Sequence, residues 1–461
     1  MINSYSPIQK LTEVDNTVYI KRDDLLPFSF GGNKARIAQE FLDDMKRKDM
    51  NCMIGYGNAR SNLSRVLANL CAAENIECHI VSPSDDDGSV VNTFNEEMCK
   101  INGAIFHYCN KYEVAKTIES VINSCKLNGK KPYYINGDIT GHGNEAVPVM
   151  AYYKAYDEIH SYEEENAIQF DYIFLPVGTG MTQAGLLCGI SYYSSNTKVI
   201  GISIARKAEV EKDVLYRFVS AFINEQGLQD INNIEYNIDD SYLCGGYGKS
   251  NNAINSIVKS MFIKYGIPFD SNYSGKAFWG MKEYLKRKNI HGKKILFIHT
   301  GGTPLFFDNL NNLQNSYAIE ECYNKTLLLE FLNSIDKLLP VPLSERVNLS
   351  EYTDKIINCG KVLSIKDGKE IKAAALFYCN DVKTGKAYIT LLATRSSAQK
   401  KGFAKKLLDG TEKYCKDHSM KTIALDTDIS NTSAIALYSK CGYRIDAIDK
   451  KIHMIKHLVE F

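Results

Sequence analysis

The chain has 461 residues, of which 44% are hydrophobic and 24% charged, the ordinary balance of a globular protein with more than one domain. No stretch of about 18 apolar residues occurs and the first residues, MINSYSPIQKL, are polar, so we expect neither a membrane-spanning helix nor a secretory signal. The net charge of +1 argues against a dedicated nucleic-acid binder.

The 13 cysteines are scattered along the chain, and no two of them form a C-x-x-C pair. A disulfide framework or a zinc ribbon requires regular cysteine spacing. We therefore predict reduced thiols, a cytoplasmic location and no metal site.

Short apolar runs alternate with helical patterns through roughly the first 300 residues. Strands are predicted at Cys52–Tyr56, Cys78–Val81, Ala104–Tyr108, Tyr133–Ile135, Tyr172–Val177, Val199–Ile204 and Ile295–His299. Between several of them apolar residues recur at helical spacing, as in Ile37, Phe41, Leu42 and Met45. Strands separated by helices predict parallel sheets flanked by helices, which is an α/β fold.

The pattern changes at the polar, Asn-rich segment Asp308–Ser316, and we predict a linker at 308–324 between a first domain at 1–312 and a second at 325–461. Two helical stretches follow it. The remaining predicted strands and helices are Val362–Ile365, Lys372–Tyr378, Lys386–Ala393, Ala404–Lys416 (helix), Thr422–Asp426, Thr432–Lys440 (helix) and two final strands. This order predicts a smaller α+β domain.

Basic charge is concentrated in the second domain. Residues 321–461 contain 23 Lys+Arg and 17 Asp+Glu, a net charge of +6, which leaves about −5 for the rest of the chain. This distribution favours an anionic ligand for the second domain.

Lys34 follows the pair Gly31-Gly32 and Asn33, and the pattern places it in the first turn of a helix. The positive end of a helix dipole disfavours a cation there. The pKa of such an amine is lowered, and the neutral form can make a Schiff base with a carbonyl compound. A surface lysine beside a loop is the plain alternative.

Three further motifs follow predicted strands. Ser61-Asn62 lies at a predicted helix start, where a simple helix cap is the alternative. The glycine-rich segment Gly178–Gly185 offers backbone N–H donors to a phosphate, but it has neither the lysine of a P-loop nor dinucleotide-binding spacing. The segment His299–Thr303 follows the last strand, at the sheet edge where ligands bind in open α/β sheets.

Together these motifs resemble the fold-type II pyridoxal-phosphate enzymes, which have the two-lobed tryptophan synthase β architecture. Within them the chain is most similar to the D-cysteine desulfhydrase and 1-aminocyclopropane-1-carboxylate (ACC) deaminase family. The resemblance implies that pyridoxal phosphate is bound to Lys34 and that Lys34 and Ser61 are catalytic. It also implies that the protein is a homodimer. It also implies roles for two active-site tyrosines, Tyr247 and Tyr273, and cofactor binding by Asn62, Gly178, Thr179, Gly180, Thr182, Ser274 and Thr300.

Three departures from the family pattern bear on the substrate. Ser274 and Thr300 stand where the deaminases have glutamate and leucine. A carboxylate near the pyridine nitrogen favours the electron-withdrawing protonated ring, whereas a hydroxyl does not. This argues against ACC deaminase and favours the desulfhydrase branch, although Leu63 replaces the Gln or His common there.

A second set of motifs lies in the C-terminal domain, where Gln399-Lys400-Lys401-Gly402-Phe403-Ala404 opens a lysine-rich helix. Small residues there let helix N–H groups approach a pyrophosphate, and a solvated basic helix start is the alternative. With the later N-x-x-A-x-x-L-Y-x-K-x-G-Y pattern, this segment resembles the GNAT N-acetyltransferases. The resemblance implies acetyl-CoA binding by Leu392, Thr394, Gln399, Gly402, Ala404 and Asn431. It also implies that Tyr438 protonates the leaving thiolate. Family members often place a glutamate on the central strand as general base, but Ala387–Thr394 contains none, so the base is unassigned and a water chain is an alternative.

The sequence thus predicts a bifunctional enzyme: a lyase or deaminase that uses pyridoxal phosphate and acts on a small amino acid, joined to an N-acetyltransferase. Racemisation or β-substitution remains an alternative, since loss of the amine leaves nothing to acetylate. A second alternative is a non-catalytic cofactor-binding module attached to an active acetyltransferase.

Overall fold

The computed structural model describes residues 5–12, 15–84, 92–228, 234–310, 313, 319–367 and 370–458. It divides the chain into two compact units, Met1–Ser316 and Tyr317–Phe461. The predicted linker at 308–324 falls partly outside the described residues. Strand β11 (Ile319–Glu321) lies within that range and pairs with β12 (Lys361–Asp367), so the second unit begins before residue 325.

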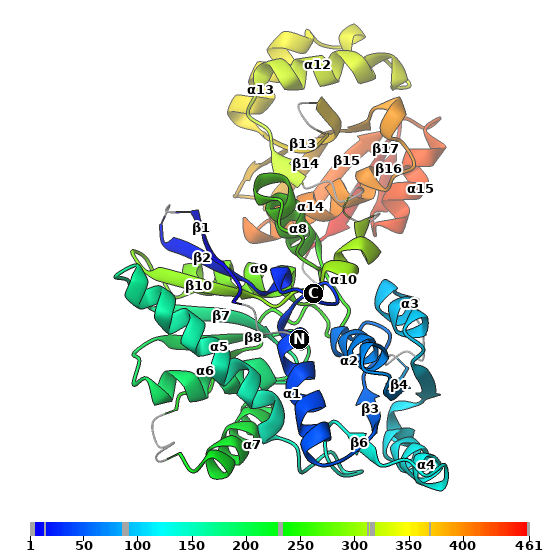
Figure 1. The fold of residues 1–461 in the computed structure, drawn as a ribbon. Helices are drawn as coiled ribbons and strands as arrows, with labels where there is room; N and C mark the ends of the chain where they lie inside the picture. Colours follow the sequence, from blue (N-terminus) through cyan, green and yellow to red (C-terminus); the bar gives the residue numbers. More distant parts are fainter. Residues whose placement is uncertain are drawn as a thin grey trace. The chain divides into compact units, whose positions relative to one another are not determined.

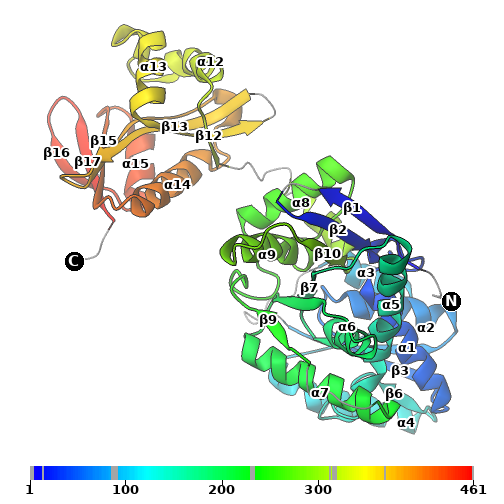
Figure 2. The same cartoon turned by 90° about the vertical axis from the view of Figure 1, so that its left-hand side faces the viewer.

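The larger sheet of the first unit has the strand order β1-β2-β10-β7-β8-β9 (Figure 1; β9 is labelled in Figure 2). Its strands are β1 (Ile8–Thr12), β2 (Thr17–Arg22), β7 (Tyr172–Val177), β8 (Lys198–Ser203), β9 (Asn237–Asp239) and β10 (Lys294–His299). All pairings are parallel except that of β1, an antiparallel edge strand.

Helices cover both faces of this sheet, because alternate residues of its strands are apolar on opposite sides. Ile173 and Leu175 of β7 belong to one core, whereas Phe174 belongs to the other. The first core includes α5 (Ala146–Glu165), α6 (Met181–Tyr192) and α7 (Ala208–Gln226), and the second includes α8 (Asn252–Tyr265), α9 (Ser274–Arg287) and α10 (Thr303–Asp308).

The smaller sheet of the first unit is fully parallel, with the order β5-β4-β3-β6. Its strands are β3 (Cys52–Tyr56), β4 (Glu77–Pro83), β5 (Ile105–Cys109) and β6 (Pro132–Tyr134). Its helices are α2 (Asn62–Ala73), α3 (Phe94–Ile101) and α4 (Val114–Leu127), with the 3-10 turn η2 (Lys111–Glu113) before α4. Another 3-10 turn, η1 (Asp23–Leu25), directly follows β2 of the larger sheet. Helix α1 (Asn33–Arg47) packs against both α2 and α5 and so joins the two lobes.

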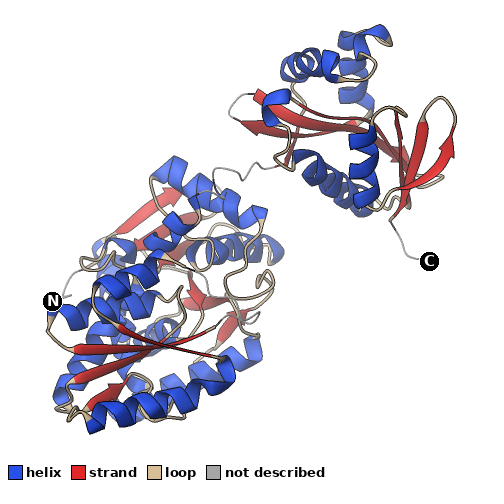
Figure 3. Ribbon diagram, turned by 90° about the vertical axis from the view of Figure 1, so that its right-hand side faces the viewer, coloured by secondary structure: helices blue, strands red, loops and turns tan. Residues whose placement is uncertain are grey.

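The second unit is one sheet with the order β11-β12-β13-β14-β15-β17-β16 and helices on both faces (Figures 2 and 3). Its further strands are β13 (Glu370–Asp381), β14 (Lys386–Thr394), β15 (Thr422–Thr427), β16 (Arg444–Ile448) and β17 (Ile452–His457). Helices α12 (Lys325–Ile335) and α13 (Leu349–Cys359) pack on one face, and α14 (Phe403–Asp417) and α15 (Thr432–Lys440) on the other. Three 3-10 turns complete it: η3 (Asp336–Leu338), η4 (Leu343–Glu345) and η5 (Ser396–Ala398).

The predicted strands and helices all occur, with ends that match or are displaced by at most three residues. The α/β class of the first unit and the α+β character of the second are confirmed. The sequence did not reveal β1, β2, β9 or β11. Three of these lie at sheet edges, and β2 ends in the charged pair Lys21-Arg22, so none shows an apolar run.

Candidate active sites

A cavity of about 320 Å³ lies at the carboxyl ends of strands from both sheets of the first unit. Ligands in open α/β sheets bind at this edge. Predicted site residues that line the cavity are Lys34, Ser61, Asn62, Leu63, Gly178, Thr179, Gly180, Thr182, Tyr247, Tyr273 and Thr300. One cavity therefore collects residues that are up to 266 positions apart in the chain.

Lys34 is the second residue of α1, and its side chain reaches the cavity. Burial lowers the pKa of its amine from 10.5 to about 8, and no neighbouring charge offsets this effect among the described residues. A large share of the amine is therefore neutral just above physiological pH, the form in which a lysine acts as a nucleophile.

The loop before Lys34 touches the loop after β10. The Asn33 N–H donates to the carbonyl of Thr300 at 3.1 Å. A Cβ atom on Gly301 would lie 2.6 Å from the Cα of Gly32, and both glycines have positive φ, 89° and 92°. Two glycines are thus needed for these backbones to meet and hold the first turn of α1 in place.

The loop between β7 and α6 supplies an anion-binding end. Gly180, with φ 79°, is the N-cap of α6 and makes no side-chain capping bond. The N–H groups of the first turn therefore keep their donor capacity toward the cavity. Asn33 donates from Nδ2 to Oγ1 of Thr182 at 2.8 Å, which links this loop to the helix of Lys34. Hydroxyls and helix N–H groups together fit a phosphate.

Ser61 and Asn62 begin α2. The Ser61 Oγ caps the helix by accepting from the N–H of Ser64 at 3.1 Å. The Oδ1 atom of Asn62 accepts from Arg65 Nη1 at 3.1 Å and from Asn95 Nδ2 at 3.0 Å. The Asn62 amide nitrogen is thereby left to donate toward the cavity.

Two tyrosines meet at the cavity wall. Their hydroxyl oxygens, on Tyr247 and Tyr273, lie 2.7 Å apart. Burial and the nearby Tyr247 raise the pKa of Tyr273, so its hydroxyl stays protonated. The loop of Tyr247 is held by Lys276, whose buried amine donates to the carbonyls of Ile204, Leu243 and Gly246 at 2.9 to 3.2 Å.

Ser274 lies outside the residues that line the cavity, although Thr300 lines it. The Ser274 hydroxyl is engaged with the buried Asp270, whose Oδ2 accepts its hydrogen at 2.8 Å. No carboxylate is present among the described lining residues. Ser274 therefore contributes to the site through Asp270, which also accepts from the main-chain N–H of Tyr273 at 2.6 Å.

The segment Lys21-Arg22-Asp23-Asp24, at the end of β2, contributes two residues to a buried ionic network that fastens α1 and α5 to β2. Lys21 pairs with Glu158, and Arg36 pairs with Glu158 at 2.6 Å and with Asp23 at 3.6 Å. Tyr152 donates to the other oxygen of Asp23. These side chains position the helix of Lys34 and do not line the cavity.

In the second unit, β14 leaves its parallel neighbour β15 part-way along. Their pairing runs from Lys386 to Ile389, and a bulge at Thr390 interrupts the pairing with β13. Beyond this point lie Leu392 and Thr394, the two strand residues expected to bind acetyl-CoA. The two strands thus splay where a ligand can pair with the free strand edge.

The predicted pyrophosphate segment is a turn that opens α14. Lys400 and Gly402 have positive φ, 61° and 76°, and Gly402 is the N-cap of α14 without a side-chain capping bond. Gln399 precedes this turn, and Ala404 is the second residue of the helix. This uncapped helix start with nearby lysines has the donors that a pyrophosphate needs.

Helix α15 carries the other two predicted residues. The Oδ1 atom of Asn431 accepts from the N–H of Ala434 at 3.2 Å, so this residue is the helix cap. Burial raises the pKa of Tyr438 to about 12, and its hydroxyl is protonated at neutral pH. A buried, protonated phenol is suited to donate a proton.

Three functional features were not found from the sequence. Asn33 was part of the G-G-N-K motif but had no assigned role, and Lys276 could not be told from a surface lysine on a helix. The third is the pair Asp426–His453, whose Oδ1 and Nδ1 atoms lie 2.5 Å apart where β14 and β15 separate. This pair comes from two strands, so only their register reveals it.

The donor set of the first cavity fits pyridoxal phosphate: a buried amine of lowered pKa, an uncapped helix N-terminus and an amide donor. This fold and site define the two-lobed α/β enzymes of fold type II. Residues 3–301 match the family described as "Pyridoxal-phosphate dependent enzyme", and the chain belongs to that family. Residues 332–443 match the acetyltransferase (GNAT) family, so a GNAT domain follows.

The relatives are similar to the first unit. A "Putative 1-aminocyclopropane-1-carboxylate deaminase" of Pyrococcus abyssi is 30% identical over 306 residues, 66% of this chain and 90% of that protein. A D-cysteine desulfhydrase of Serratia proteamaculans is 24% identical over 316 residues, 67% of this chain and 94% of that protein. A crystal structure described as an "ACC deaminase homologue" has 30% identity and a TM-score of 0.61, and covers 68% of this chain and 94% of its own.

Two further observations are not confined to one site. All 13 cysteines are free thiols. Within the described ranges, no helix combines the length and the apolar character needed to cross a membrane.

Proposed function

We propose that the chain is a bifunctional enzyme. Its first unit is a lyase or deaminase that uses pyridoxal phosphate and acts on a small amino acid, as a D-cysteine desulfhydrase does, and its GNAT domain acetylates an amine with acetyl-CoA. The observation that carries the first half is the buried Lys34 amine in one cavity with the uncapped N-terminus of α6. We also propose a homodimer in the cytoplasm, for which family likeness and the free thiols are the support.

Each part of the cavity has a role toward the cofactor. Lys34 would hold it covalently, the turn Gly178–Thr182 would hold its phosphate, and the Asn62 amide would donate to its ring oxygen. Thr300 lines the same cavity. The bound cofactor supplies a conjugated ring that withdraws electrons from the α-carbon of the substrate.

The side chains of the chain then move protons. Once released from the cofactor as a free amine, Lys34, whose pKa is about 8, is suited to take the α-proton from the substrate near neutral pH. The Ser61 hydroxyl lies on the same wall and binds the substrate carboxylate. The Tyr273 hydroxyl, 2.7 Å from that of Tyr247, stays protonated because burial raises its pKa, and it can donate to a leaving group.

The residues in and around the cavity favour one class of substrate over another. Ser274 and the absence of a carboxylate among the described lining residues argue against the strong electron sink that opening a cyclopropane ring requires. Leu63 gives the wall beside Asn62 an apolar surface. These features favour a desulfhydrase-type substrate over ACC.

Racemisation or β-substitution is the second candidate, and the presence of the GNAT domain favours it. Elimination releases ammonia and a keto acid, which has no amine to acetylate. If both domains act on one substrate, the first must therefore retain the amine.

The first test is the colour of the purified full-length protein. We expect a yellow protein whose visible band is lost in Lys34→Ala and kept in Lys111→Ala, because these are the two lysines among the described lining residues. A colourless wild type that takes up no added pyridoxal phosphate would leave only the acetyltransferase as an enzyme.

The second test is proton-exchange NMR of the full-length protein with a panel of D- and L-amino acids and ACC. We expect exchange of the α-proton in a small amino acid, with keto acid and ammonia for elimination, or the mirror-image amino acid for racemisation. Release of keto acid from ACC would contradict the argument from Ser274.

Acetyl-CoA binding tests the second unit. A Cβ atom on Gly402 meets no other atom within 4 Å, so a larger side chain fits there. We expect Gly402→Glu to bind acetyl-CoA at least about tenfold more weakly, because its carboxylate faces the pyrophosphate. Gly402→Ala has the same backbone strain without the charge and serves as the control; equal losses in both variants would contradict the assignment.

We further propose that the Asp426–His453 pair supplies the missing general base of the GNAT domain. Hydrogen bonds to Asp426 and to Asp449 raise the pKa of His453. An Asp426→Asn variant should lower kcat and shift the acidic limb of the kcat pH profile, while Tyr438→Phe should lower kcat without that shift. An unchanged profile in Asp426→Asn would show that the base lies elsewhere.

A further inference from the structure

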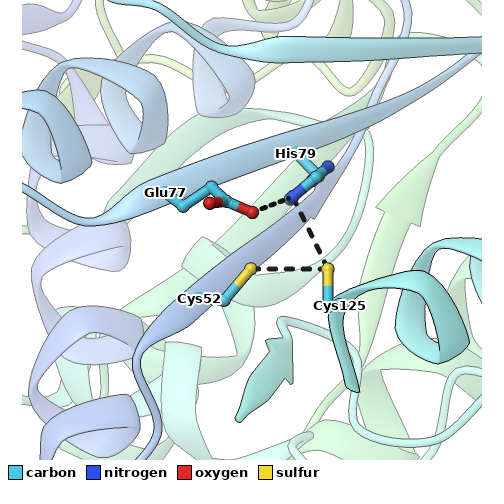
Figure 4. A group of neighbouring side chains, drawn as sticks. All are labelled: Cys52, Glu77, His79 and Cys125. Atoms are coloured by element: carbon cyan, nitrogen blue, oxygen red, sulfur yellow. Dashed lines mark hydrogen bonds and ion pairs between the residues drawn. The ribbon is translucent and has the colours of Figure 1, made fainter. Parts of the chain in front are cut away.

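Four side chains that commonly bind metals gather in the smaller lobe of the first unit: Cys52, Glu77, His79 and Cys125 (Figure 4). The two sulfur atoms lie 3.6 Å apart, and the Cys125 sulfur lies 3.5 Å from the His79 Nε2. The same nitrogen lies 2.9 Å from the Glu77 Oε1. One ligand atom from each residue lies within 4.8 Å of all the others.

The fold explains why these four side chains converge. Cys52 and Glu77 are the first residues of neighbouring parallel strands and lie in register, and His79 follows Glu77 on the same face of β4. Helix α4 buries Ile118, Val121 and Cys125, and it packs on β4 and β5. The cluster thus forms where α4 meets the amino-terminal ends of β3 and β4.

Two of the distances between ligand atoms are those of a tetrahedral zinc site, whereas the 2.9 Å between His79 Nε2 and Glu77 Oε1 is a hydrogen-bond distance that must lengthen by about 0.5 Å when both atoms bind the ion. Zinc–sulfur bonds of about 2.3 Å and a zinc–nitrogen bond of about 2.0–2.1 Å at tetrahedral angles put two sulfurs about 3.8 Å apart and sulfur and nitrogen about 3.5 Å apart. The distances between these pairs of atoms, 3.6 Å and 3.5 Å, agree within 0.2 Å. We propose that Cys52, Glu77, His79 and Cys125 bind one zinc ion.

Neighbouring residues complete the site. The Nδ1 atom of His79 lies 2.9 Å from the Nε2 of His107, a contact that orients the imidazole with its Nε2 toward the sulfurs. Lys130 lies 3.2 Å from the Oε2 of Glu77, which leaves Oε1 for the ion. Two thiolates and one carboxylate exceed the charge of Zn²⁺ by one, and the Lys130 ammonium neutralises the remainder.

The site is separate from the cofactor cavity. Cys52 and Cys125 are at most 2% exposed and His79 is 8% exposed, whereas the Glu77 side chain is 35% exposed. Four protein ligands complete a tetrahedral zinc site and leave no position for a substrate. The cofactor cavity is lined by Tyr56, Gly57 and Pro83, at the opposite ends of β3 and β4. The ion is therefore structural: it fastens α4 to the sheet, whatever reaction the enzyme catalyses.

The sheet provides a matched control. Cys71 of α2 and Cys78 of β4 form a second buried thiol pair, linked by a side-chain hydrogen bond. Because Cys78 lies between Glu77 and His79, its side chain points to the other face of the strand. Cys71 and Cys78 are not part of a group of metal-binding side chains among the described residues.

The experiment is metal analysis of the full-length protein purified without chelator from zinc-supplemented medium. We expect about one zinc per chain in the wild type and in Cys71→Ser, and at least about tenfold less in Cys125→Ser and in His79→Ala. His107→Ala should retain the site with an affinity for Zn²⁺ about 10- to 100-fold lower.

A second measurement applies to the wild type alone and does not depend on how the variants fold. Removal of the ion with a chelator should lower the Tm, and added Zn²⁺ should restore it. Co²⁺ in its place should give ligand-field bands at the red end of the visible spectrum, away from the cofactor band. The proposal is overturned by a wild type without metal whose Tm ignores added Zn²⁺, or by zinc content equally reduced in Cys71→Ser and Cys125→Ser.

Discussion

Lys34 owes its character to its position rather than to its neighbours' charges. Its side chain enters a cavity at the start of a helix, and both the burial and the helix N-terminus favour the uncharged amine. Lys276 has the same lowered pKa of about 8, also chiefly from burial, but its amine is occupied by three carbonyls. One lysine is thus poised to react, and the other holds a loop in place.

The lowered pKa of Lys34 predicts how cofactor uptake depends on pH. A neutral amine is required, so the rate at which the apoprotein takes up pyridoxal phosphate should rise with a midpoint near pH 8 and fall away below it. The visible band followed from about pH 6 to about pH 10 measures this rate. Nα-acetyl-lysine in solution, which keeps the side-chain amine, is the reference. Its rate of reaction with pyridoxal phosphate should show a midpoint near the ordinary lysine pKa. A protein midpoint equal to that reference would contradict the assignment.

The buried carboxylate of Asp23 should make the stability of the first unit depend on pH. Burial alone would raise its pKa, but Arg36 and Lys21 lower it below the ordinary value. The stabilisation is therefore present above the unfolded-state pKa and is lost as the pH falls through the folded-state pKa. Replacing this buried carboxylate by Asp23→Asn should lower the free energy of unfolding by about 3 kcal/mol at neutral pH.

Denaturant-induced unfolding of the first unit measures this change in the free energy of unfolding. Asp49→Asn removes a carboxylate that pairs with Lys131 at the surface, and this control should leave the unfolding midpoint unchanged. Equal effects of the two substitutions would show that the contribution of Asp23 to the free energy of unfolding does not depend on its burial.

At the scale of elements, junctions decide where the functional residues lie. The contact of Gly32 with Gly301 joins the loop after β2 to the loop after β10. In the second unit the bulge at Thr390 changes the face of the sheet on which the following side chains of β14 lie. Ala387 and Ile389 pack in one core, whereas Leu391 and Ala393 pack in the other, although strict alternation would put all four on one face.

The glycine contact can be tested with a matched pair of substitutions. Gly301 and Gly103 both have positive φ, 89° and 73°, but only Gly301 has a neighbour within 4 Å. Both alanine variants incur the strain of about 1–2 kcal/mol for a left-handed backbone. Gly301→Ala should in addition lose most of its bound pyridoxal phosphate, because the first turn of α1 must move, whereas Gly103→Ala should keep it. Cofactor content after gel filtration distinguishes them, and equal content would contradict the argument.

At the scale of the whole molecule, the two units have separate hydrophobic cores. The clusters of the first unit contain residues up to Leu313, and those of the second unit begin with Ile319 and Cys322. Each unit therefore has the buried apolar surface to unfold as its own cooperative transition.

Calorimetry of the full-length protein should accordingly show two transitions. Ligands stabilise only the unit that binds them, so pyridoxal phosphate should raise one Tm and acetyl-CoA the other. At a ligand concentration of about 100 times Kd the gain is about 2.7 kcal/mol in the free energy of unfolding of that unit. A single transition that both ligands raise together would show that the units unfold as one.

The sequence by itself determined the class of both units, most strand positions and the motifs around Lys34, Gly178–Thr182 and Gly402, because periodicity and glycine placement are local properties of the chain. Only the tertiary structure could show that Ser274 is turned toward Asp270, that Lys276 holds the Tyr247 loop and that Asn33 reaches Thr182. The cluster of Cys52, Glu77, His79 and Cys125 was likewise invisible, since strand register and the packing of α4 create it. Side chains that meet through pairing between distant strands have no regular spacing in the sequence. For that physical reason only the tertiary structure reveals them.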